Sequence, residues 1–141
     1  MEFFHKHPIQ KRFSDLDMLG HATNSIYQQY FDLGRMHYFT QVLNEQMNWE
    51  NEGLILVNIS ISFNEQVKLY DDIEVRTKIH KIGNKSLQMA QQIFNLTTQK
   101  VAAQSESTMV GYHGKQNTSI PIPSRWRERI AAYESDTSFD L

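Results

Sequence analysis

The sequence contains no cysteine, which excludes disulfide bonds, a thiol nucleophile and cysteine-ligated zinc. It has no apolar run near the roughly 20 residues of a transmembrane helix. The first eight residues also lack the apolar centre of a signal peptide. We therefore expect a cytoplasmic protein without a membrane span.

Positive charge is not in excess either. The 14 Lys and Arg residues face 16 Asp and Glu residues, for a formal charge of −2, whereas a nucleic-acid-binding protein usually has a basic excess. The motif G-x-S-x-G, the P-loop, the dinucleotide-binding fingerprint and H-E-x-x-H are all missing. His5 and His7 have no third ligand beside them, so we predict no metal site and no cofactor.

The chain has the length and composition of one folded domain. Its 141 residues suit one domain rather than two, and 40% hydrophobic with 21% charged residues favours a packed core over disorder. We expect that domain to span residues 1–133, followed by a flexible tail over residues 134–141.

The longest helical pattern follows Ser25. Apolar residues recur at spacings of three and four over residues 26–43, which predicts one long helix with a broad apolar face. Gly34 lies in its middle, where glycine costs about 1 kcal/mol relative to alanine. The expected compensation is close approach of the helix to a strand or to another chain. A second, short helix is predicted over residues 125–133.

Alternation of apolar and polar residues predicts strands in the rest of the chain. They run over residues 9–13, 55–63, 73–79, 87–96 and 101–112. The last four have hairpin spacing, which predicts an antiparallel meander. We therefore expect an α+β fold in which a curved antiparallel sheet of about five or six strands wraps the long helix. The helix covers only one face of the sheet, so we also expect a homodimer or homotetramer.

The segment before the long helix carries the residues best suited to catalysis. Asp15 and Asp17 lie two residues apart, and Gly20-His21 makes a turn before the polar residues that lead to Asn24. The N-terminus of a helix offers free N–H donors and partial positive charge, which bind an oxyanion or a polarised carbonyl. A carboxylate beside such donors is suited to acyl chemistry. Aspartates in this setting are also typical loop-capping residues.

These residues and the order of the elements together resemble a known family. The pattern aromatic-x-Asp-x-Asp-x-x-Gly-His, then Asn and Tyr, is present as Phe13, Asp15, Asp17, Gly20, His21, Asn24 and Tyr27. It is similar to the motif of the hotdog-fold acyl-CoA thioesterases of the 4-hydroxybenzoyl-CoA thioesterase and YbgC-like type. The resemblance extends from residue 9 to about residue 133 and implies a hotdog fold and an acyl-CoA substrate. Ala22-Thr23 stands where Val-Asn is usual, a departure that concerns the shape of the pocket.

The resemblance also implies roles for individual residues. Asp17 is the expected catalytic carboxylate, as nucleophile or general base, and an N–H near Asn24 is expected to polarise the thioester carbonyl. For His21 three roles stay open: it positions the substrate, it tunes Asp17, or it is a structural donor in its turn. Lys85 and Ser86 match a position from which some members contact the phosphates of coenzyme A.

Gly20 and Tyr27 are the remaining residues predicted to bind the substrate. Coenzyme A is expected only as a part of that substrate and not as a separate cofactor. Tyr27 also fits a core position, and Lys85 also fits a solvated charge on a turn. Two other functions stay open. One is a non-catalytic hotdog domain that binds an acyl group or coenzyme A, and the other is a thioesterase that acts on acyl-carrier-protein.

Overall fold

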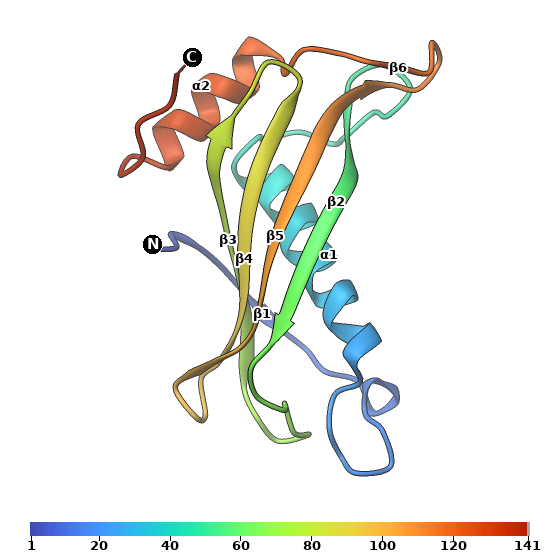
Figure 1. The fold of residues 1–141 in the computed structure, drawn as a ribbon, viewed down its shortest axis with the longest axis vertical. Coiled ribbons are helices and arrows are strands. Elements are labelled where there is room, and N and C mark those ends of the chain that lie inside the picture. Colours follow the sequence, from blue (N-terminus) through green and yellow to red (C-terminus); the bar gives the residue numbers. More distant parts are fainter. Residues whose placement is uncertain (141) are drawn as a thin grey trace.

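The computed structural model describes residues 1–140. It contains a six-stranded antiparallel sheet, a long helix against one face of the sheet, and a short helix at one end (Figure 1). The elements are β1 (His5–Ile9), a 3-10 turn (Phe13–Asp15), α1 (Asn24–Gln41), β2 (Gly53–Phe63), β3 (Ile73–Ile82), β4 (Ser86–Asn95), β5 (Lys100–His113), β6 (Thr118–Ser119) and α2 (Ser124–Tyr133). The predicted α+β fold with a curved antiparallel sheet is confirmed.

The strand order is β1-β3-β4-β5-β2, with β6 paired to β5. The predicted meander is correct for β3, β4 and β5, but it is wrong for β2, which pairs with β5 instead of β3. The connection over residues 64–72 is longer than a hairpin loop of two to five residues, so the chain can cross the end of the sheet. At the start of that crossing, the N–H groups of Asn64 and Glu65 both donate to the Ala102 carbonyl. This arrangement leaves β2 at a free edge.

Helix α1 packs on β1, β3 and β4, and buries aromatic residues along its length. The helix contributes to two apolar clusters, one through Phe31 and the other through Tyr38, which are both fully buried. A Cβ atom on Gly34 would lie 2.6 Å from Val75 Cγ2 and 2.8 Å from Gln91 Nε2. The close approach of helix and strand expected at this glycine is therefore confirmed.

The first strand was predicted in the wrong place. It covers His5–Ile9 rather than residues 9–13, because the side chains of His5 and Ile9 both face the core. Pro8 lies inside it, which an edge strand tolerates since the ring removes only one N–H. Phe13–Asp15 instead forms a 3-10 turn that leads into the loop before α1.

The predicted C-terminal helix is present as α2, so residues 1–140 contain a short helix beside the long one that the sheet wraps. Its Trp126 and Ile130 are buried in the same cluster as Tyr38. Glu134, within the segment expected to be flexible, is fully buried and accepts hydrogen bonds from the Tyr38 hydroxyl and the Ile79 N–H. The start of that segment is thus part of the packed core. Over residues 1–140, neither helix combines the length and apolarity that crossing a membrane requires.

Candidate active site

The loop between the 3-10 turn and α1 is a small hairpin. Leu16 and Ala22 form an antiparallel bridge, and the Asp17 N–H donates to the His21 carbonyl at 2.9 Å. Gly20 occupies the tip with a φ of 76°, a left-handed conformation that glycine adopts without a steric penalty. The hairpin therefore holds its residues in a defined arrangement just before the helix begins.

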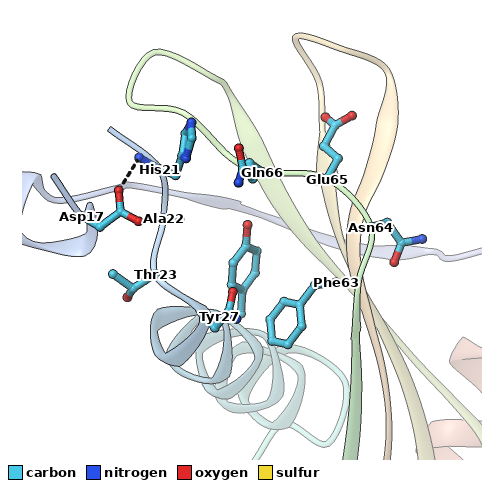
Figure 2. Close-up of a pocket in the computed structure, with 10 residues that line it drawn as sticks. Asp17, His21, Ala22, Thr23, Tyr27, Phe63, Asn64, Glu65 and Gln66 are labelled. Atoms are coloured by element: carbon cyan, nitrogen blue, oxygen red, sulfur yellow. Dashed lines mark hydrogen bonds between the residues drawn. The ribbon is translucent and has the colours of Figure 1, made fainter. Parts of the chain in front are cut away.

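The side chain of Asp17 is exposed, and one of its oxygens is held by the loop. Oδ1 accepts the N–H groups of Leu19 at 2.9 Å and His21 at 3.2 Å, and the second of these bonds is drawn in Figure 2. Within residues 1–140 no donor is found for Oδ2. The carboxylate therefore caps the loop through one oxygen and keeps the other free.

Asp17 lies at the rim of a cavity of about 480 Å³. Its lining is Asp17, His21, Ala22, Thr23, Asn24, Tyr27, Phe63, Asn64, Glu65 and Gln66. Figure 2 shows Asp17 and His21 on one side, Tyr27 and Phe63 at the base, and Glu65 on the opposite side. The Tyr27 ring is 2% exposed and meets the Phe63 ring edge to face at 5.3 Å between centroids. The cavity thus joins an apolar floor to polar walls.

The N-terminus of α1 opens into the same cavity through Thr23 and Asn24. Thr23 precedes the helix but makes no side-chain cap, and its hydroxyl lies 3.3 Å from the Ser25 hydroxyl instead. Within the described residues, the backbone N–H groups of Asn24 and Ser25 have no acceptor. These free donors and the helix dipole are suited to binding a carbonyl oxygen that gains negative charge.

Asp15 occupies a different environment from Asp17, because its side chain is 1% exposed. Its carboxylate accepts the Arg12 N–H and Nε–H, each at 3.0 Å, and the Tyr30 hydroxyl at 2.8 Å. Burial raises the pKa of Asp15, but the hydrogen bonds from Arg12 and Tyr30 outweigh it and hold the pKa below its usual range. The contact with Arg12 makes Asp15 a brace within the loop.

Four of the predicted site residues, Asp17, His21, Asn24 and Tyr27, meet at this cavity. Gly20 shapes the hairpin tip but does not line the cavity. Asn24, Asp17 and His21 are therefore placed where their predicted roles require, and those roles stay predictions.

Lys85 and Ser86 are not brought to this cavity within one chain. They lie at the turn between β3 and β4, at the opposite end of the sheet from the loop before α1 (Figure 1). Phe63 is level with Ala103 and Ile93, and Ser86 lies seven residues before Ile93 on β4. A strand rises about 3.3 Å per residue, so roughly 23 Å separates the two positions. The prediction for Lys85 and Ser86 depended only on their position after a turn, and the sequence contains no information on this distance.

The wall formed by residues 63–66 was not predicted from the sequence. It reaches the cavity because the crossing connection packs on the hairpin, where the Ala22 N–H donates to the Val67 carbonyl at 2.8 Å. That contact joins segments 45 residues apart, and no local pattern marks it. Among residues 1–140, no group of three His, Asp or Glu side chains is arranged to hold a metal ion.

Comparison with known proteins identifies the class to which this arrangement belongs. The family model of the thioesterase-like superfamily matches residues 12–130. The chain therefore belongs to the thioesterase-like superfamily. None of the curated proteins matches it.

Several solved structures share the fold over nearly the whole chain. A Thermus thermophilus thioesterase complexed with coenzyme A and zinc is 27% identical, with a TM-score of 0.80 over 94% of this chain and 96% of that one. A Staphylococcus aureus protein in complex with CoA is 17% identical, with a TM-score of 0.83 over 97% and 87% of the two chains. YbaW, a probable Escherichia coli thioesterase, is 22% identical, with a TM-score of 0.74 over 89% and 95%. The predicted hotdog fold is confirmed, and the protein is a thioester hydrolase.

Proposed function

We propose that the protein hydrolyses acyl-CoA thioesters at the cavity beside Asp17. The observation that carries this proposal is that one cavity is lined both by Asp17, which has a free carboxylate oxygen, and by Asn24, whose backbone N–H is free. The free N–H of Ser25 follows Asn24 in the first turn of α1. The coenzyme A bound to the Thermus thermophilus thioesterase supports the choice of acyl carrier.

The proposed chemistry needs two events at the thioester carbonyl. The N–H donors at the start of α1 stabilise the oxyanion as the carbonyl carbon becomes tetrahedral. Asp17 Oδ2 either removes a proton from the attacking water or attacks the carbon itself, forming an anhydride that water then cleaves. The carbon–sulfur bond breaks, the thiolate of coenzyme A leaves, and the acyl group departs as a free acid. Label in Asp17 after a single turnover in ¹⁸O water would identify the anhydride route with water attack on the Asp17 carbon, because in the general-base route the water oxygen enters only the product acid.

The test is thiol release from acetyl-, butyryl-, octanoyl- and benzoyl-CoA by the wild type and Asp17→Asn. Asp17→Asn should keep the fold and lose turnover by at least about 10²-fold, since the amide is neither base nor nucleophile. Asp72→Asn, at an exposed carboxylate outside the cavity, is the matched control and should be unaffected. Undiminished turnover by Asp17→Asn would remove Asp17 from the mechanism. Thermal stabilisation by coenzyme A without thiol release would indicate a binding protein.

We further propose that the functional unit is a homodimer formed through the free edge of β2. The edge offers unpaired backbone groups, and Val57 and Phe63 on it are 54% and 48% exposed. A two-fold axis through the middle of β2 would pair the β2 strands of the two chains antiparallel. The sheet of the partner subunit would then run in the opposite direction to the sheet of the first chain. The partner's Lys85 would then lie at the end of the sheet that carries Asp17.

This arrangement would give Lys85 a role that a single chain does not allow. Lys85→Ala should raise KM about tenfold for a CoA thioester and leave KM unchanged for the matching pantetheine thioester, which lacks the nucleotide phosphates. Light scattering should give the mass of two chains for the wild type and of one chain for Val57→Glu, which buries a charge at the proposed edge. A wild-type monomer with full turnover would exclude the dimer.

A further inference from the structure

Asp15 links three parts of the site that are separate in the sequence. Its carboxylate accepts the Tyr30 hydroxyl from the second turn of α1 at 2.8 Å, and two N–H groups of Arg12 at the start of the loop. Its carbonyl accepts the N–H of Thr23, the residue that immediately precedes α1, at 3.1 Å. One residue thus joins both ends of the hairpin to the helix.

From these contacts we propose that Asp15 and Tyr30 are positioning residues, which fix Asp17 relative to the N-terminus of α1. This inference rests on the proposed thioesterase site. Asp17 follows Asp15 by two residues. Leu16, the residue between them, pairs with Ala22 and so closes the base of the hairpin that carries Asp17. Asp17 is therefore connected to Asp15 through Leu16 on one side of the hairpin, and the Thr23 N–H connects the Asp15 carbonyl to the start of α1 on the other.

Asp15 and Tyr30 are also inaccessible to a substrate. Asp15 and Tyr30 are 1% and 4% exposed and neither lines the cavity, so neither touches the substrate. Every other contact that holds Asp17 in place lies within the hairpin, from Leu19, Gly20 and His21. Those contacts fix the shape of the hairpin but not its position on the helix. Two side-chain contacts join the segment before the hairpin to α1: the buried Tyr30–Asp15 bond, and an exposed bond from Arg12 Nη2 to Gln29 Oε1 at 3.2 Å.

Loss of the Tyr30–Asp15 bond should change the rate more than substrate binding. A displacement of about 1 Å between a catalytic group and the reacting carbon can cost about 10² in rate. The distance between Asp17 and the N–H donors matters only as the tetrahedral species forms, so its effect falls on kcat. Contacts with the coenzyme A part of the substrate are unchanged, and KM should stay nearly constant.

The chain supplies a matched control for the test. Tyr38 lies on the same helix, is also buried, and donates its hydroxyl to the carboxylate of Glu134 at 3.0 Å, far from the cavity. Tyr30→Phe and Tyr38→Phe therefore remove the same kind of bond from the two ends of α1. Both variants should unfold at a lower temperature than the wild type.

The experiment measures kcat and KM for butyryl-CoA and benzoyl-CoA, with the melting temperature of each protein. Tyr30→Phe should lower kcat at least tenfold with KM within twofold, whereas Tyr38→Phe should keep kcat within twofold. Arg12→Gln removes a donor to Asp15 from the surface, so it should fold even if Tyr30→Phe does not, and it should lower kcat to an intermediate value.

Two failures can be told apart. Equal kcat in the wild type, Tyr30→Phe and Arg12→Gln, or equal losses in Tyr30→Phe and Tyr38→Phe, would overturn the positioning role and leave the thioesterase proposal intact. A wild type that releases no thiol from any acyl-CoA would instead overturn the proposed function on which the inference rests.

Discussion

The hydroxyl of Tyr38 donates a hydrogen bond to the carboxylate of Glu134, 96 residues further along the chain. The same carboxylate accepts the Ile79 N–H at 3.0 Å and faces the Lys78 ammonium at 3.5 Å. Three elements, α1, β3 and the segment after α2, therefore meet at one buried charge. Lys78 is 3% exposed, and its only other carboxylate partner within residues 1–140 is Asp136.

Removal of the Glu134 carboxylate should destabilise the whole domain. Glu134→Ala leaves a buried ammonium with one partner and two donors without an acceptor, a change that typically costs about 3–5 kcal/mol. Glu134→Gln keeps an acceptor and should cost less. The measurement is urea unfolding at neutral pH, with Glu128→Ala on the exposed side of α2 as control, expected within about 0.5 kcal/mol of the wild type. An Ala variant as stable as the wild type would show that the Glu134 carboxylate contributes nothing to the stability of the fold.

Acid should destabilise the fold through His5, which is 1% exposed. Its Nε2 atom lies 3.2 Å from Nδ1 of His37. Burial, followed by repulsion from the His37 and His7 imidazoles, lowers the pKa of His5 from 6.5 to about 4. The unfolded chain therefore binds a proton that the folded chain excludes. Stability should fall as the pH drops from about 6.5 to about 4, by about 3 kcal/mol in total, and then level off for this group.

The pH dependence can be assigned by substitution. His5→Phe removes the titrating ring and should flatten the stability profile between pH 6.5 and 4. His113→Gln, at a partly exposed histidine on β5, should leave the slope of the profile unchanged. If His5→Phe retains the wild-type slope, the buried imidazole is not the source of the acid sensitivity.

Gly34→Ala tests the contact between α1 and the sheet. The substitution favours a helix by about 1 kcal/mol, yet its Cβ would lie 2.6 Å from Val75 Cγ2 and 2.9 Å from Thr77 Oγ1. Overpacking of this kind costs about 1–3 kcal/mol, so the net effect should be a modest loss of stability. Met36→Ala on the exposed face of the helix is the control for helix propensity and should be neutral or slightly stabilising. A more stable Gly34→Ala protein would mean that the helix can move outward at no cost.

Local patterns were sufficient for most of the fold. The alternation over residues 55–63 and the three-and-four spacing over residues 26–43 lie within single elements, and both elements were predicted within two residues of their ends. The first strand was misplaced because it is short and contains Pro8, and β3, with which it pairs, lies far along the chain. The pairing of β2 with β5 was missed because a connection of nine residues gives no indication of where it leads.

The candidate site divides in the same way. Asp17, His21 and Asn24 were predicted from one continuous motif, which the hairpin keeps together. Phe63 was missed because it reaches the cavity only through sheet pairing and the crossing connection. Within one chain Ser86 lies at the other end of the sheet, a distance on which a turn motif contains no information, so the role of Lys85 and Ser86 stays a prediction.

The contact between Phe63 and Tyr27 forms the floor of the cavity and should limit the size of the acyl group. Phe63→Ala removes a ring that meets Tyr27 edge to face at 5.3 Å, and so enlarges the space next to the proposed oxyanion site. The ratio of kcat/KM for octanoyl-CoA to that for acetyl-CoA should rise about tenfold, since a bulkier chain gains room and a small one loses contact. Val57→Ala, at a similarly exposed apolar residue on β2 outside the cavity, controls for effects on the strand edge. If both variants shift the ratio alike, the edge of β2 and not the aromatic floor selects the acyl group.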